Sequence, residues 1–174
     1  PDGQLIAFDR QQSLKWAIYV IKAQGGTATQ ISTDWANNAR PSWSSDGRWI
    51  YFASDRTGRF EIWKMPSTGG QELQVTKNGG VDSLEAPDGS AIYYMKYSTA
   101  SLWKCLKDGT QERKVLDSVC VYALAKHGIY FLPCRDPSAP SQFFDFLDFA
   151  TRRTTTLFSI NSSRVGGHLS ISPD

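Results

Sequence analysis

The sequence contains few of the residues on which most catalytic and metal sites depend. In 174 residues it has two histidines, His127 and His168, and three cysteines, Cys105, Cys120 and Cys134. No pair of cysteines has Cys-x-x-Cys spacing, and a structural zinc site needs about four ligands at characteristic spacings. The sequence therefore predicts neither a metal site nor a cofactor.

Neither histidine lies in a sequence context in which it would activate a nucleophilic side chain as a general base. His127 precedes Gly128 where other parts of the chain have Asp-Gly, so we expect it in a surface turn. His168 opens the last apolar segment and has no Gly-x-Ser-x-Gly motif around it. Asp145 and Asp148 are three residues apart, on opposite faces of a strand, which does not suit a glycosidase carboxylate pair. We therefore predict that the chain is not an enzyme.

The three cysteines do not point to a particular catalytic or redox function. Their odd number leaves at least one thiol free, and the pairing of the other two stays open. Cysteine is also a small apolar residue that is often buried. The ordinary interpretation is that all three lie in strands in this structural role.

Long apolar runs and a concentrated basic face are also absent. No run approaches the roughly 20 residues that cross a bilayer, so membrane insertion is not expected. The chain begins at Pro1 without a signal peptide, and we expect a processed or excised segment. The net charge is +2, with basic residues scattered as pairs such as Arg113–Lys114 and Arg152–Arg153. Because nucleic-acid-binding domains concentrate basic residues on one face, no nucleic-acid partner is predicted.

What the sequence does contain is an internal repeat. Asp-Gly recurs along the chain and is followed by degenerate copies, at Asp2–Gly3, Asp46–Gly47, Asp88–Gly89, His127–Gly128 and Pro173–Asp174. The successive steps are 44, 42, 39 and 47 residues. A period of about 43 residues lies in the range of β-propeller blades.

Each unit contains short apolar segments separated by turn residues. In the second unit these segments are residues 40–44, 49–54, 60–65 and 72–76. Aromatic residues make up 13% of the chain, which favours strands, and no helical periodicity competes. We therefore predict an all-β propeller of four blade repeats, each with four antiparallel strands, at residues 1–44, 45–86, 87–126 and 127–174.

Several phrases resemble the TolB-like, WD-repeat-like propeller repeat with its Trp-Ser-Pro-Asp-Gly signature. They include Pro-Ser-Trp-Ser-Ser-Asp-Gly-Arg-Trp-Ile-Tyr-Phe at 41–52, Glu-Ile-Trp-Lys-Met at 61–65 and Gly-Gly-Gln-Glu-Leu-Gln-Val-Thr at 69–76. The resemblance covers the whole chain and is strongest in the first two units. Ser45 replaces the usual proline, and Glu85–Ala86 replace Trp-Ser in the third unit. The last unit is similar to the C-terminal propellers of bacterial winged-helix regulators and receptor-like kinases.

The resemblance implies a ring of six to eight blades and a periplasmic or extracytoplasmic location, while the free thiols fit the cytoplasm equally well. The C-terminal segment, residues 167–172, is expected to supply the innermost strand of the first blade. Three assemblies stay open. The four blades close on themselves, two chains pair through blade edges into an eight-bladed ring, or the chain is an arc of a larger propeller. Closure is expected because it removes exposed strand edges.

Function in propellers lies in the loops around the central channel, and we expect a protein or peptide partner there. Aromatic residues and arginine are frequent interface anchors. The candidate partner-binding residues, in the loops that lead into the innermost strands, are Trp35, Asn38, Arg40, Asn78, Asp82, Tyr122, Arg164 and His168. The ordinary alternative is packing between blades for Trp35 and solvated loop for the polar residues.

The predicted function is thus a non-catalytic binding or scaffolding propeller, a sensor or interaction module of a larger bacterial protein. One alternative is the propeller domain of a peptidase, which would require a separate hydrolase domain. The other is a carbohydrate-binding or lyase propeller, and only Tyr122, Arg164 and His168 approach the cluster that it would need.

Overall fold

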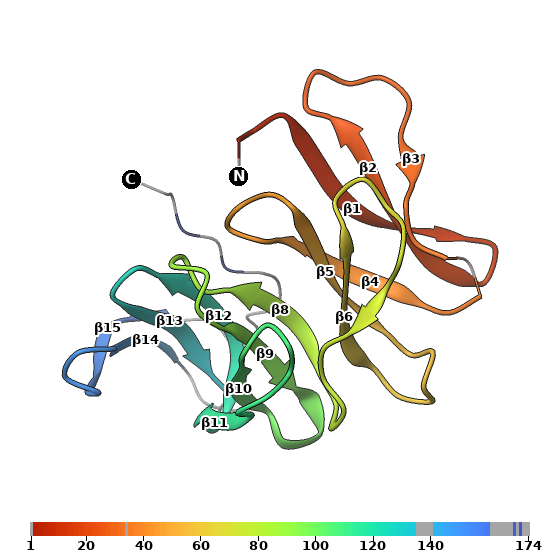
Figure 1. The fold of residues 1–174 in the computed structure, drawn as a ribbon. Helices are drawn as coiled ribbons and strands as arrows, with labels where there is room; N and C mark the ends of the chain where they lie inside the picture. Colours follow the sequence, from red (N-terminus) through yellow and green to blue (C-terminus); the bar gives the residue numbers. More distant parts are fainter. Residues whose placement is uncertain (1, 34, 135–140, 161–168, 170, 172–174) are drawn as a thin grey trace.

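The computed structural model describes residues 2–33, 35–134, 141–160, 169 and 171. These residues form four antiparallel sheets, each built from strands that follow one another in the chain (Figure 1). The first sheet has three strands, β1 (Leu5–Gln12), β2 (Lys15–Lys22) and β3 (Thr29–Gln30). The second has four strands, β4 (Asn38–Trp43), β5 (Trp49–Ser54), β6 (Glu61–Pro66) and β7 (Leu73–Gln74).

The third and fourth sheets repeat this plan with four strands each. The third contains β8 (Val81–Glu85), β9 (Ile92–Lys96), β10 (Ser101–Cys105) and β11 (Arg113–Leu116), with a short 3-10 turn η1 (Tyr97–Thr99) between β9 and β10. The fourth contains β12 (Val119–Ala125), β13 (Gly128–Pro133), β14 (Gln142–Asp148) and β15 (Thr154–Ile160). The all-β propeller prediction is confirmed. The strand expected at 167–172 falls outside the described residues, apart from Leu169 and Ile171.

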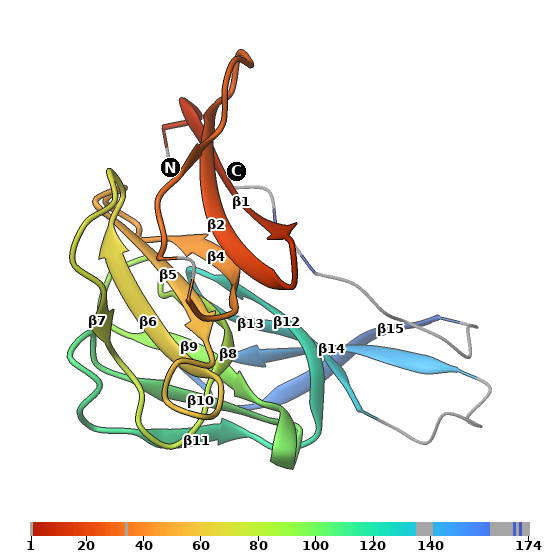
Figure 2. The same ribbon diagram turned by 90° about the vertical axis from the view of Figure 1, so that its right-hand side faces the viewer.

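The sheets lie in a row that follows the chain, with the first and fourth at its two ends (Figure 1). Turned by 90°, the outer hairpin of β14 and β15 projects away from the first two sheets (Figure 2). Strand β4 contacts β1 of the preceding sheet and β8 of the following one. The first strand of each later sheet therefore lies on the inner side, as in a propeller blade.

The Asp-Gly turns have the same local structure in successive blades. Gly3, Gly47 and Gly89 have φ of 72°, 69° and 69°, a left-handed conformation that glycine adopts without steric cost. The carboxylates of Asp46 and Asp88 each accept a hydrogen bond from the backbone N–H two residues on, at 3.0 and 2.9 Å. This shared geometry explains why the dipeptide marks the repeat.

The core consists of three apolar clusters, each between neighbouring sheets. Ile18 and Phe52 belong to the cluster between the first two sheets, and Tyr51 and Tyr94 to the next. The third cluster contains Ile129 and joins the third and fourth sheets. Middle strands such as β5 are buried along almost their whole length because they pack on both faces.

The tryptophans in the strands are at most partly buried. Trp43 and Trp63 are partly buried against the first cluster, and Trp49 and Trp103 against the second. Trp16 is 40% exposed on β2. Tryptophan is large and seldom fully buried, and here it covers the outer parts of the clusters.

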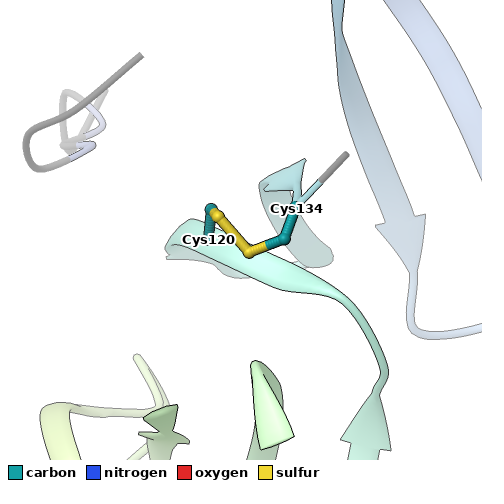
Figure 3. The surroundings of a disulfide bond; sticks show 2 residues. All are labelled: Cys120 and Cys134. Carbon is teal, nitrogen blue, oxygen red and sulfur yellow. A yellow bond between two sulfur atoms is a disulfide. The ribbon is translucent and has the colours of Figure 1, made fainter. Parts of the chain in front are cut away.

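The interpretation of all three cysteines as small apolar residues is wrong for two of them. Cys120 and Cys134 form a disulfide between β12 and the residue after β13 (Figure 3). The strand register shifts between Val119 and Val121, and Cys120 occupies that bulge with its Cα 4.9 Å from the Cα of Cys134. Cys105 is buried and free, as expected. Among the described residues, no helix is long and apolar enough to cross a membrane.

Candidate binding site at the inner strand ends

The first strands of the second and third sheets carry a bulge at the same place. The register shifts between Ala39 and Ser42 in β4 and between Val81 and Leu84 in β8. Arg40 lies in the first bulge with φ of 58°, and Asp82 in the second with φ of 48°. A positive φ is uncommon outside glycine, and bulges often re-aim a side chain near a functional site.

The two bulges bring Arg40 and Asp82 together across the boundary between sheets. A guanidinium nitrogen of Arg40 forms an ion pair with the carboxylate of Asp82. The same carboxylate accepts a hydrogen bond from the hydroxyl of Tyr97, in the turn between β9 and β10. The Arg40 guanidinium also lies over the Tyr97 ring, 5.4 Å from its centroid. These three residues are called the inner-end cluster below.

Backbone groups released by the bulges find partners in neighbouring sheets. The backbone N–H of Arg40 donates to the carboxylate of Asp9 on β1, at 3.2 Å. The hydroxyl of Tyr122 donates to the carbonyl oxygens of Asp82, at 2.5 Å, and Tyr93, at 3.0 Å. Buried polar backbone groups need such partners. The bulges are therefore fixed by contacts between sheets as well as by their own strands.

The inner-end cluster is only partly buried. The side chain of Arg40 is 40% exposed and that of Asp82 is 20% exposed, and Tyr97 as a whole is 54% exposed. Burial, followed by the hydrogen bond to Asp82, raises the pKa of the Tyr97 hydroxyl well above its usual range, so it stays a donor. The cluster offers a guanidinium and an aromatic ring to a partner. Its carboxylate is already engaged with both neighbours.

Of the other expected site residues, Tyr122 and Asn38 are interior. Tyr122 is 6% exposed, and burial raises its pKa well above the usual range. The Asn38 amide donates to the carbonyl oxygen of Thr33, at 2.8 Å, and its oxygen accepts from Arg56, at 2.9 Å. Both side chains thus position loops and strands, and a direct contact of either with a partner stays a prediction.

Trp35 and Asn78 lie in different surroundings from the inner-end cluster. Trp35 is 60% exposed, with its ring 5.1 Å from the guanidinium of Arg56. The Asn78 amide donates to the Glu112 carboxylate at 3.1 Å. Their role in binding stays a prediction. Arg164 and His168 lie outside the described residues.

Sequence reasoning missed Tyr97 and Asp9. Tyr97 lies in the turn between the second and third strands of its blade, at the same end as the loop that leads into the innermost strand. Considering these turns together with the loops would have identified it. Asp9 had no comparable signal, because it acts through the backbone of a residue in another sheet.

Within the described part of the chain, no group of three or more histidine, cysteine, aspartate or glutamate side chains could hold a metal ion. The inner-end cluster contains donors, a carboxylate and a ring, without a nucleophile beside a base. The arrangement suits recognition of polar or aromatic groups.

Residues 1–120 match the family model of the TolB beta propeller domain. This chain belongs to the TolB β-propeller family. The matched range contains the first three sheets and reaches the start of β12. The fourth sheet of this TolB-type propeller lies beyond the match and is also where the repeat is weakest in sequence.

An uncharacterised protein of Agrobacterium fabrum is 29% identical over 99 residues, which is 56% of this chain and 34% of that protein. The structure of a putative TolB from Agrobacterium tumefaciens has a TM-score of 0.78 at 22% identity, covering 92% of this chain and 63% of that one. TolB from Acinetobacter baumannii has a TM-score of 0.73 at 13% identity, covering 88% and 40%. The chain therefore spans about a third of the curated relative and less than two thirds of these structures.

The same fold also occurs in an enzyme. The structure of an oligogalacturonate lyase from Vibrio parahaemolyticus has a TM-score of 0.61 at 13% identity, covering 93% of this chain and 50% of that one. Likeness at this identity shows the fold alone.

Proposed function

We propose that this TolB-type propeller domain is a non-catalytic module that binds a protein or peptide at the inner ends of its strands. The observation that supports the proposal is the inner-end cluster, which joins the second and third sheets. Arginine and tyrosine are favoured anchors of interfaces because they combine contact area with directed hydrogen bonds. The cluster is held by two bulges and keeps an exposed guanidinium and ring.

The test compares proteins captured by variants of the immobilised chain. We expect a partner that the unaltered chain retains to be lost with the Arg40→Gln, Tyr97→Ala double variant. Arg48→Gln is the control, because Arg48 is an exposed arginine in the turn between β4 and β5, outside the cluster. Mass spectrometry identifies the retained proteins, and circular dichroism checks that each variant is folded. An identical set of proteins on all three would contradict the proposal.

The second candidate function is that of a lyase-type propeller, which the likeness to the oligogalacturonate lyase favours. Among the described residues, the histidine that such a site could use is His127, which lies in an exposed turn. An assay with oligogalacturonate, with and without added divalent metal, distinguishes the lyase function from the binding function. Formation of an unsaturated product by the purified chain would favour the lyase.

We also propose that the domain lies in an oxidising, extracytoplasmic compartment. The Cys120–Cys134 disulfide supports this location, because cytosolic thiols are kept reduced. Alkylation of the protein in intact cells before and after reduction measures the state of the pair. Free thiols at both positions would contradict the location.

A further inference from the structure

A large cleft lies between the third and fourth sheets. Its volume is about 1320 Å³, above the roughly 300–1,000 Å³ of most small-molecule sites. Turns after β8, β12 and β14 border it, which is the Asp-Gly end of the blades. Arg40 and Asp82 lie near the other end of the inner strands, so this cleft is a separate place on the molecule.

One wall of the cleft is basic. Tyr93 pairs with Lys104 across β9 and β10, and Lys104 pairs with Arg113 across β10 and β11. Residues directly opposite one another in a sheet point to the same face, so the three form a row. The Lys104 ammonium lies 5.2 Å from the centroid of the Tyr93 ring and donates to its hydroxyl at 3.3 Å.

A third cation comes from the fourth sheet. The turn after β14 reaches across the cleft, and the ring of Phe149 stacks on that of Tyr93 with centroids 6.2 Å apart. Arg152 lines the cleft from this turn. Burial and then the charge of Arg113 lower the pKa of Lys104, and Arg152 acts in the same direction while Asp88 opposes it. Arg113 and Arg152 thus lie close enough to Lys104 for their charges to act on its ammonium.

No acidic side chain of the described residues forms an ion pair with any of these cations. Two aspartates line the cleft, but each is bound within its own turn. Asp88 accepts from the backbone N–H of Ser90 at 2.9 Å, and Asp148 from the backbone N–H of Thr151 at 2.7 Å. These bonds leave both carboxylates charged, but four basic residues that line the cleft, Lys104, Arg113, Lys126 and Arg152, outnumber them. The cleft therefore keeps an excess of positive charge.

The opposite wall contains leucine side chains beside the turn residues Lys126 and Arg152. Leu124 pairs with Ile129, Ile129 with Leu147, and Leu147 with Thr154, which forms a second row across the fourth sheet. Leu124, Leu147 and Thr154 all line the cleft, and Ile129 is fully buried. A basic row on one sheet thus faces an apolar row on the next.

We propose that this cleft binds an extended peptide segment in which acidic and apolar side chains alternate. Successive side chains of an extended chain point to opposite sides. A strand lying between the two walls would direct its carboxylates to Lys104, Arg113 and Arg152 and its apolar side chains to Leu124 and Leu147. The charge and the two different walls favour this ligand over a neutral or uniformly acidic one.

The test uses a fluorescent synthetic peptide of alternating glutamate and leucine and the full chain, followed by fluorescence anisotropy. We expect saturable binding that weakens at least tenfold in the Lys104→Gln, Arg113→Gln double variant. Arg152→Gln alone is a milder variant with a smaller expected loss. Arg48→Gln is the control for Arg152→Gln, because it also removes one positive charge and Arg48 does not line the cleft, and it should bind as the unaltered chain does. Thermal melts show whether each variant folds.

Two further probes test the pattern itself. A peptide with glutamine in place of glutamate should lose binding, and one with its glutamates and leucines in separate blocks should bind more weakly. Equal binding of all three peptides, or equal binding by the double variant, would overturn the proposal. Binding of an oligogalacturonate instead of the peptide, lost in the double variant, would assign the cleft to an acidic saccharide and overturn the peptide. Loss of the Arg40 and Tyr97 side chains should leave peptide binding in the cleft unchanged. The proposal for the cleft and the proposal for the inner-end cluster can therefore be contradicted independently.

Discussion

At the scale of single residues, Glu85 shows how one buried carboxylate joins two sheets. It lies on β8 of the third sheet and accepts hydrogen bonds from Ser45, at 2.7 Å, and Tyr51, at 2.9 Å, of the second sheet. Lys107 forms an ion pair with the same group at 2.9 Å. Burial alone would raise the pKa of Glu85, but the donors Ser45, Lys107 and Tyr51 outweigh it and hold the pKa below its usual range.

This lowered pKa predicts loss of stability in acid. The stabilisation that the ionised Glu85 carboxylate provides is complete above its unfolded-state pKa of about 4.3. It is lost as the pH falls through the pKa of Glu85 in the folded state. We expect Glu85→Gln to lower the free energy of unfolding by about 2 kcal/mol at pH 7. The difference from the unaltered chain should shrink as the pH falls below about 4.3. Urea unfolding at a series of pH values measures both effects.

The control for Glu85 is Asp117→Asn. The Asp117 side chain is 70% exposed and forms an ion pair with Lys114 at the surface, so its loss should change the free energy of unfolding little at any pH. An equal effect of the two variants would show that Glu85 does not join the sheets as described.

Tyr122 carries a second prediction at this scale. The Tyr122→Phe variant leaves the carbonyl oxygens of Asp82 and Tyr93 without their donor, and we expect a loss of about 2 kcal/mol in the free energy of unfolding. Tyr130→Phe, a partly buried tyrosine on β13, is the matched control and should cost much less. Chemical denaturation compares the two, and similar values would contradict the assignment.

At the scale of elements, the disulfide joins two neighbouring strands of the fourth sheet. Cys120 and Cys134 are 14 residues apart. Closing a loop of about 15 residues removes denatured-state entropy worth roughly 3 kcal/mol at most. We expect the Cys120→Ser, Cys134→Ser variant to melt at a lower temperature than the unaltered chain. A reducing agent should lower the melting temperature of the unaltered chain only, and an effect on both would contradict the prediction.

The strands were largely predictable, while their irregularities were not. Residues 49–54 were expected as a strand and form β5 with those bounds, because every residue before Ser54 is apolar. Residues 72–76 were expected as a strand, but β7 covers only Leu73–Gln74. The Thr76 hydroxyl accepts from the backbone N–H of Ile62, at 2.8 Å, where a longer ladder would place a carbonyl oxygen. The Ser32 hydroxyl accepts from the backbone N–H of Ile18 at 2.9 Å in the same way, so a hydroxyl takes the place of a carbonyl oxygen at this position in the first two repeats.

The candidate site was predictable only as a region. Loops leading into the inner strands pointed to Arg40 and Asp82, which do meet. Their pairing depends on bulges in two strands and on Tyr97 from a third segment. Contacts between sheets decide such geometry, and local sequence does not encode them. The disulfide was left open for the same reason, since spacing does not determine pairing.

At the scale of the whole molecule, the two end sheets expose apolar side chains. Ile6 on β1 is 50% exposed, and Leu157 and Phe158 on β15 are 48% and 52% exposed. Exposed apolar groups favour association. The chain should therefore associate in solution, in line with one of the three assemblies left open above, the pairing of two chains through blade edges.

Light scattering after size exclusion tests this association at two protein concentrations. We expect a mass above that of the monomer, which falls towards the monomer in Phe158→Glu. Leu14→Glu is the control, because Leu14 is 87% exposed in the turn between β1 and β2. A monomer at both concentrations would contradict the expectation.

The free thiol between the second and third sheets gives the protein a built-in reporter. Cys105 is 2% exposed, and burial is the main cause that raises its pKa to about 12. A thiol-reactive dye can reach it only while the two sheets part, so the labelling rate counts opening events. The labelling rate would thus report how often the second and third sheets separate, without any engineered label. A slower rate in the presence of a partner would show that binding at the inner ends reduces this opening.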